Sequence, residues 1–242
     1  MVVTGDLDGT DVDGLLAGSL GAWSPENPDG SSGTAHEVET TPGREAAPRA
    51  ADAARVVLVD RPGSVQSELL LAAPGPDRRV DGGWAPFPVL AWVIGGAPNA
   101  RIDQVLREEK GYTYGIRSGF QPRQVGGMAM VTGSVRADST ADSLRLLREI
   151  LDGVAGGITP EETRAGVDFM TLTAPGRFDT ADAVADELAM LAADDLPLDF
   201  TSETIAAMRR LEPADLDAAW REHVVPEWTV VVVGDAALYR EQ

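Results

Sequence analysis

The chain has 242 residues, 43% of them hydrophobic, and carries 39 acidic against 20 basic side chains, which gives a formal net charge of −19. This size supports one large domain or two small ones, and the absence of cysteine excludes disulfides, thiolate zinc sites and cysteine nucleophiles. The charge argues against a nucleic-acid partner, and the lack of any apolar run of membrane-spanning length argues against a membrane partner.

The N-terminal residues predict a strand followed by a helix. Residues 1–6 read MVVTGD, a short strand ending in a turn, and residues 10–22 show helical spacing of apolar side chains. The start lacks the cationic and apolar regions of a signal peptide, so we expect a cytoplasmic protein. A similar Val-rich segment closing in Gly-Asp recurs at residues 229–235. The recurrence predicts that residues 1–23 are the last strand and helix of a preceding homologous half that is mostly absent. The alternative is that Gly-Asp simply ends many strands.

Residues 24–54 are rich in Pro, Gly, Ser, Thr, Glu and Ala and almost lack large apolar side chains. Such a composition cannot bury enough surface to offset chain entropy, which predicts a flexible linker. Within it, His36 and Glu37 resemble the start of a zinc motif, but Thr40 stands where the second histidine would be needed. We interpret this as a chance near-match.

Residues 55–242 are predicted to form the C-terminal domain. The sequence 159–162, TPEE, is a capping box with proline at the first helical position and marks a helix start. The continuous apolar run at 228–233 indicates a strand inside the sheet. Because strands and helices come in blocks, we expect an α+β fold, a two-layer sandwich of a largely antiparallel sheet with helices on one face. Strands are predicted at 55–59, 65–73, 112–120, 128–135 and 228–233, and helices at 85–94, 99–110, 139–154, from 160, and at 180–193, 202–211 and 213–224.

The sequence carries no self-contained catalytic apparatus. Its two histidines are His36, in the predicted linker, and His223, at the end of the last predicted helix. His223 is best explained as a helix-end residue that meets the negative end of the helix dipole. A Gly-x-Ser-x-Gly elbow is missing, and Gly95-Gly96 follows a helix where a phosphate-binding loop would follow a strand.

The most informative segment is residues 95–116, which read GGAPNARIDQVLREEKGYTYGI. It resembles the signature of the C-terminal half of the pitrilysin (insulinase) superfamily of zinc peptidases, which includes mitochondrial processing peptidase. That signature runs Gly-Gly, a few residues, Ser-Arg-Leu-Phe, then Arg-Glu-x-x-Gly-Leu-x-Tyr. Arg101, Arg107 and Tyr114 stand at its spacing, whereas Ala100 and Asp103 depart from it, as does the tyrosine at 112.

The resemblance implies a division of labour between two halves that close around a peptide. The N-terminal half carries zinc on His-x-x-Glu-His and a distal Glu, and the C-terminal half contributes an Arg and a Tyr, here Arg107 and Tyr114. A permanently charged guanidinium and a phenol can bind a substrate carbonyl or the developing oxyanion. Tyr112 would share a strand face with Tyr114, and the resemblance selects Tyr114. The plainer interpretation is a solvated, Gly-capped helix end followed by a packing tyrosine.

The predicted function is therefore the Arg/Tyr-bearing C-terminal half of a zinc-dependent peptidase. The chain itself would bind no cofactor and be inactive alone, with zinc in the missing N-terminal half or partner subunit. The resemblance implies as partners that half or a homologous subunit, in a dimer, together with a peptide substrate. Two alternatives stay open: a non-catalytic scaffold half of the same fold, and an unrelated α+β binding domain.

Overall fold

A five-stranded mixed sheet organises the computed structural model, which describes residues 1–21, 56–123, 126–224 and 227–239. The strand order is β1-β5-β2-β4-β3; β1 and β5 are parallel, and the other neighbouring pairs are antiparallel. The fifth strand therefore lies inside the sheet, as its apolar run predicts. The strands are β1 (Val56–Asp60), β2 (Gln66–Gly75), β3 (Ile116–Pro122), β4 (Gly127–Arg136) and β5 (Thr229–Gly234).

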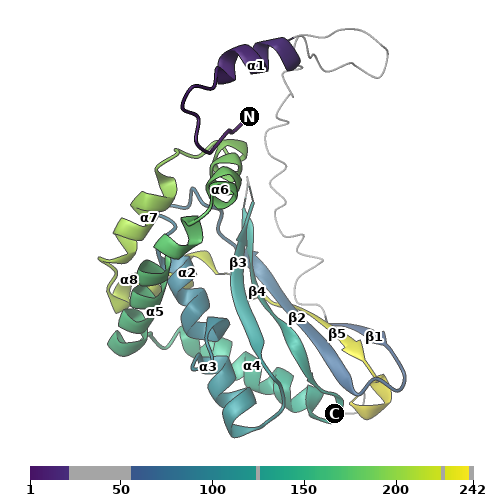
Figure 1. The fold of residues 1–242 in the computed structure, drawn as a ribbon. Coiled ribbons are helices and arrows are strands. Elements are labelled where there is room, and N and C mark those ends of the chain that lie inside the picture. The colour runs from purple at the N-terminus through teal and green to yellow at the C-terminus, as the bar shows by residue number, and fades with distance from the viewer. Residues whose placement is uncertain (22–55, 124–125, 225–226, 240–242) are drawn as a thin grey trace.

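Helices cover one face of this sheet (Figure 1). Along β2, the side chains of Leu69, Leu71 and Ala73 are buried, while the alternating Glu68 points to the other, open face. This two-layer α+β arrangement confirms the predicted fold class. The helices are α1 (Val12–Ser19), α2 (Pro86–Ala91), α3 (Arg101–Asp103), α4 (Thr140–Val154), α5 (Pro160–Thr173), α6 (Ala181–Ala193), α7 (Phe200–Met208) and α8 (Pro213–His223), with π-helical turns η2 (Trp92–Gly96) and η3 (Gln104–Glu109) and 3₁₀ turns η4 (Ala137–Ser139), η5 (Pro175–Phe178) and η6 (Ala236–Leu238).

The helix formed by α2 and η2 lies at the centre of the core, and its close approach to β3 positions the candidate site. Phe87, Leu90 and Ile94 are almost fully buried beneath the sheet. A Cβ on Gly95 would lie 2.9 Å from the backbone nitrogen of Ser118, so a side chain there would push helix and strand apart. The first motif glycine is therefore required by packing.

Several predicted boundaries differ from the structure. Residues 1–6 form no strand, and the strand predicted from residue 112 begins only at Ile116, as β3. The helix predicted at 99–110 begins as α3, and its N-cap is Ala100, not Asn99, with no capping hydrogen bond from the side chain. The capping box at 159–162 is present with both of its hydrogen bonds, which confirms that helix start. The predicted linker 24–54 lies outside the described residues.

In the described segments, no helix is both long enough and apolar enough to cross a bilayer.

Candidate functional site

The candidate site is the corner where η3 ends and the chain turns toward β3. Gly111 has φ of +63°, in the left-handed region that favours glycine, and its N–H donates to the Arg107 carbonyl over 3.1 Å. The next residue, Tyr112, donates its N–H to the Leu106 carbonyl over 2.8 Å. The glycine turn predicted at this position is confirmed, and it reverses the chain immediately after the turn that carries Arg107.

Hydrogen bonds fix the segment on both sides of Tyr114. The Tyr112 hydroxyl donates to the Asp142 carboxylate over 3.0 Å, and this bond raises the pKa of the Tyr112 phenol. The Thr113 hydroxyl donates to the Ser134 carbonyl over 2.6 Å and accepts from the Gly115 N–H over 3.0 Å. The backbone around Tyr114 is therefore held against β4 and α4.

Tyr114 itself is 92% exposed. It lies in the irregular segment before β3, which corrects the prediction that it projects from a strand. The Thr113 hydroxyl bonds both the Ser134 carbonyl and the Gly115 N–H, and the pairing of β3 with β4 begins only at Ile116 and Gly133. Among the described residues, nothing hydrogen-bonds to the Tyr114 phenol, which leaves it available to a ligand.

Arg107 is also accessible, with 40% of its side chain exposed. Its guanidinium Nε lies 3.5 Å from a carboxylate oxygen of the adjacent Glu108, which is itself half exposed. A solvated pair at that distance is weak and easily exchanged for another acceptor. In the part of the chain that the structure describes, the guanidinium has no further partner.

The other motif arginine, Arg101, is committed to a different role. Its Nε and Nη2 donate to the two carboxylate oxygens of Glu162 over 2.6 and 2.7 Å, and Nη2 also donates to the Gly157 carbonyl over 2.8 Å. Burial raises the pKa of Glu162, but the hydrogen bonds from Arg101 and from the Thr159 backbone outweigh it and leave the pKa below 4.5. Arg101 thus fastens the start of α5 to α3.

Asp103, a departure from the family signature, was missed as a structural residue. Its side chain is fully buried and accepts the Ile116 N–H over 3.3 Å and the Arg117 guanidinium over 3.1 Å. The buried carboxylate therefore fixes the first residue of β3 just beyond Tyr114. The signal available in the sequence was an acidic residue at an otherwise apolar helix position, with arginine following at 117.

The described residues contain no group of three or more histidine, cysteine or acidic side chains that could hold a metal ion. His223 is the last residue of α8, with its ring in edge contact with Phe87 at 5.8 Å between ring centres. His36 and the near-match around it lie outside the described segments. The side chains of Arg107 and Tyr114 can therefore offer hydrogen-bond donors and one positive charge to a ligand, but the described chain offers no site that fits zinc.

Comparison with known proteins shows which family this chain resembles. The family model described as "Peptidase M16 inactive domain" matches residues 1–170. An uncharacterized zinc protease of Mycobacterium leprae is 29% identical over 50% of this chain and 28% of its own length. One of Streptomyces coelicolor is 33% identical over 46% of this chain and 24% of its own length. The matched stretches thus span about a quarter of each relative.

A solved structure shares the fold. The peptidase M16 inactive domain from Pseudomonas fluorescens superposes with a TM-score of 0.69 at 23% identity, over 75% of this chain and 43% of that one. The predicted resemblance to the C-terminal half of a zinc-peptidase superfamily is confirmed. With the family model covering well over half of its length, this chain belongs to the peptidase M16 inactive domain family.

Proposed function

We propose that this chain is the Arg/Tyr-bearing half of a zinc-dependent peptidase, in which Arg107 and Tyr114 contact a peptide held between two halves. The zinc-protease names of the two bacterial relatives support a peptidase as the whole protein. The zinc would lie in an N-terminal half or partner subunit, since the described residues offer no metal-binding group. The assembly would be a two-half or dimeric protein.

One observation carries the proposal: residues 101–114 include two arginines and two tyrosines, and within the described structure only one side chain of each kind lacks a strong polar partner. Glu162 occupies Arg101, and Asp142 occupies the Tyr112 hydroxyl. Arg107 and Tyr114, the pair that the family spacing selects, are exposed, and among the described residues their side chains form no hydrogen bond or ion pair beyond the weak pair with Glu108. Committed neighbours make the corner rigid, and the free pair can bind a ligand without breaking a structural bond.

The chemistry of the pair suits a peptide carbonyl. A guanidinium is charged at every physiological pH and presents a fork of N–H donors, and a phenol adds one O–H donor. Placed on either side of a carbonyl oxygen, the two groups would orient the scissile peptide and stabilise negative charge that develops on that oxygen. Neither group needs to lose or gain a proton for this role.

A non-catalytic scaffold half is the second candidate, and the family description as an inactive domain favours it. In that case the same exposed pair would contact a partner chain and not a substrate. The two candidates differ in what happens to turnover when the pair is removed.

The test uses the protein joined to its zinc-bearing half and a fluorogenic peptide. We expect Arg107→Ala and Tyr114→Phe each to lower kcat by about a hundredfold, the usual cost of removing one oxyanion donor. Arg148→Ala is a matched control, because Arg148 is an exposed helical arginine on α4, with 82% of its side chain accessible. Unchanged kcat and KM in both corner variants would refute direct participation and favour the scaffold.

A further inference from the structure

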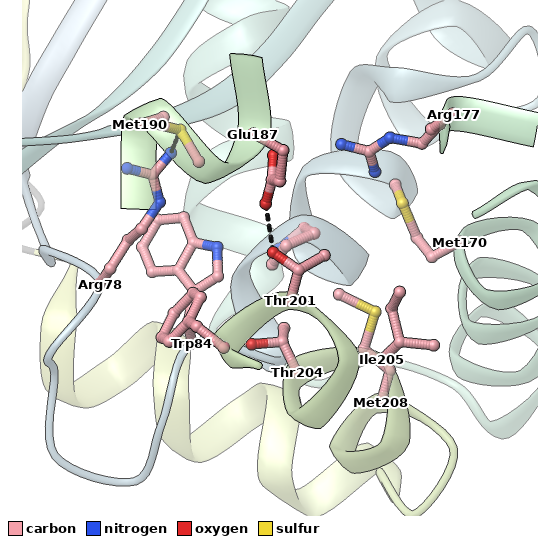
Figure 2. A pocket seen from close by; sticks show the side chains of 12 residues that line it. Arg78, Trp84, Met170, Arg177, Glu187, Met190, Thr201, Thr204, Ile205 and Met208 are labelled. Atoms are coloured by element: carbon pink, nitrogen blue, oxygen red, sulfur yellow. Dashed lines mark hydrogen bonds between the residues drawn. The ribbon is translucent and has the colours of Figure 1, made fainter. Parts of the chain in front are cut away.

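A second candidate site lies in the helical layer, away from the Arg107 corner. A cavity of about 180 Å³ opens between α5, α6 and α7 and the segment that precedes α2 (Figure 2). Its apolar wall is formed by Trp84, Met170, Ile205 and Met208. None of its lining residues belongs to the 101–116 segment, and α6 and α7 lie at the opposite end of the helical layer from α3 (Figure 1).

Two arginines line this cavity, but only one of them is neutralised. Arg78 donates to the Asp194 carboxylate over 2.5 Å and also contacts the Met190 sulfur at 3.1 Å. Arg177, on η5, extends its guanidinium toward the middle of the pocket in Figure 2. Within the described residues its side chain has neither a carboxylate nor a hydrogen-bond acceptor as partner.

The cavity also contains an uncompensated carboxylate. Glu187, on α6, accepts the Thr201 hydroxyl and is partly buried. No lysine or arginine of the described chain comes within ion-pair distance of it, Arg177 included. The pocket therefore presents one free positive and one free negative group that do not satisfy each other, with an aromatic and aliphatic wall beside them.

We infer that this cavity binds a small apolar amino acid in its zwitterionic form. Arg177 would hold the α-carboxylate through the two-pronged geometry that guanidinium groups offer carboxylates. Glu187 would accept the α-ammonium, and the side chain would pack on Trp84 and the methionines. The volume supports this ligand class, because pockets for drug-sized molecules begin at about 300 Å³ and this one is smaller.

The inference does not depend on the proposed peptidase role. It is specific in requiring both charges on one small ligand: a carboxylate alone leaves Glu187 unpaired, and an amine alone leaves Arg177 unpaired. Leucine satisfies both groups, N-acetyl-leucine lacks the ammonium and leucinamide lacks the carboxylate. All three compounds keep the leucine side chain, and leucinamide also keeps nearly the size of leucine, so the difference between leucine and leucinamide reports the carboxylate most directly.

Isothermal titration calorimetry of the full chain with these three compounds provides the test. We expect L-leucine to bind, and N-acetyl-L-leucine and L-leucinamide each to bind at least about tenfold more weakly. Equal affinity for leucine and either analogue would show that the pocket recognises one charge only and would overturn the inference. So would the absence of leucine binding to the unmodified protein.

Two variants that each remove one charge test whether leucine binds in this cavity. Arg177→Gln and Glu187→Gln remove one charge each and are expected to weaken leucine binding by about tenfold or more. The glutamine at 187 keeps an acceptor for the Thr201 hydroxyl, and Arg177 is exposed, so both variants should fold. Arg148→Gln and Glu203→Gln are matched controls on exposed helix surfaces. Leucine affinity that is unaltered in both pocket variants would contradict the assignment, and unfolding profiles confirm that each variant is native.

Discussion

Identical side chains in the candidate site have different roles because of partners distant in sequence. Arg101 and Arg107 lie on the same helical segment, yet only Arg101 meets a carboxylate in bidentate geometry. That carboxylate, Glu162, is also the third helical residue of α5 and closes its capping box, where it accepts the Thr159 N–H over 2.8 Å. A single acidic side chain thus joins helix capping to the packing of two helices.

The Arg101–Glu162 contact predicts a pH-dependent stability. Because the folded-state pKa of Glu162 lies below its ordinary value of 4.5, the contribution is complete above pH 4.5 and is lost as the pH falls through the lower folded pKa. Glu162→Gln should therefore lower the free energy of unfolding at neutral pH by about 1–2 kcal/mol, with allowance for partial solvent exposure. Urea denaturation at a series of pH values measures the difference.

The neighbouring Glu161, exposed in the same first helical turn, supplies the control for this experiment. Glu161→Gln should leave the free energy of unfolding nearly unchanged at every pH. The deficit of Glu162→Gln relative to the unmodified protein should shrink below pH 4.5. A deficit that stays constant across the acid range would mean that the carboxylate charge is not what stabilises the fold.

At the scale of elements, close packing between helices holds α5 against α2 and η2. Gly166 in α5 faces α2, and a Cβ added there would lie 2.9 Å from Val89 Cγ1 and 3.3 Å from Trp92 Cε3. Val89 is fully buried and its branched side chain has little rotamer freedom, so it cannot move aside cheaply. The absence of a side chain at this position allows α5 and α2 to approach each other.

Two glycine-to-alanine substitutions should therefore change stability in opposite directions. Gly153→Ala, on the exposed side of α4 with no atom near the new Cβ, should stabilise the protein by about 0.5–1 kcal/mol through helix propensity. Gly166→Ala has the same propensity gain but overpacks a rigid contact at a cost of about 1–3 kcal/mol. We expect a net loss of about 1 kcal/mol, measured by chemical denaturation. If both substitutions stabilised the protein equally, the interhelical contact at Gly166 would not be tight.

At the scale of the whole molecule, the N-terminal helix is nearly independent of the domain. α1 buries none of its residues. In the segment that precedes α1, the Thr4 hydroxyl donates a hydrogen bond to the Ala181 carbonyl over 2.8 Å. By contrast, β5 pairs on both sides, with β1 and with β2. The assignment of residues 1–23 to a preceding half stays a prediction.

Deletion of residues 1–21 should leave the thermal unfolding midpoint of the remaining chain almost unchanged, because little buried apolar surface is lost. Deletion from residue 227 onward should abolish cooperative unfolding, since it removes an interior strand and leaves β1 without its partner. Differential scanning calorimetry distinguishes the two outcomes. A large drop in the midpoint after the first deletion would show that α1 is integral to this domain.

Local patterns in the sequence determined the α+β class, the block order of strands and helices, the capping box at Thr159 and the turn at Gly111. Each depends on neighbours a few residues away, through the period of apolar side chains, a side chain capping its own helix or a backbone angle that glycine adopts. These features could therefore be predicted from the sequence alone. The family spacing also selected Arg107 and Tyr114, whose role in the site stays a prediction.

The tertiary structure alone decided which polar groups are free. Arg101 and Tyr112 are occupied by carboxylates 61 and 30 positions away, and strand β3 starts late because Thr113 bonds a carbonyl 21 positions away. The cavity with Arg177 and Glu187 likewise joins η5 and α6 to the segment before α2. Such contacts depend on how helices cross and where a sheet closes, and the periodicity of a single segment carries no information about them.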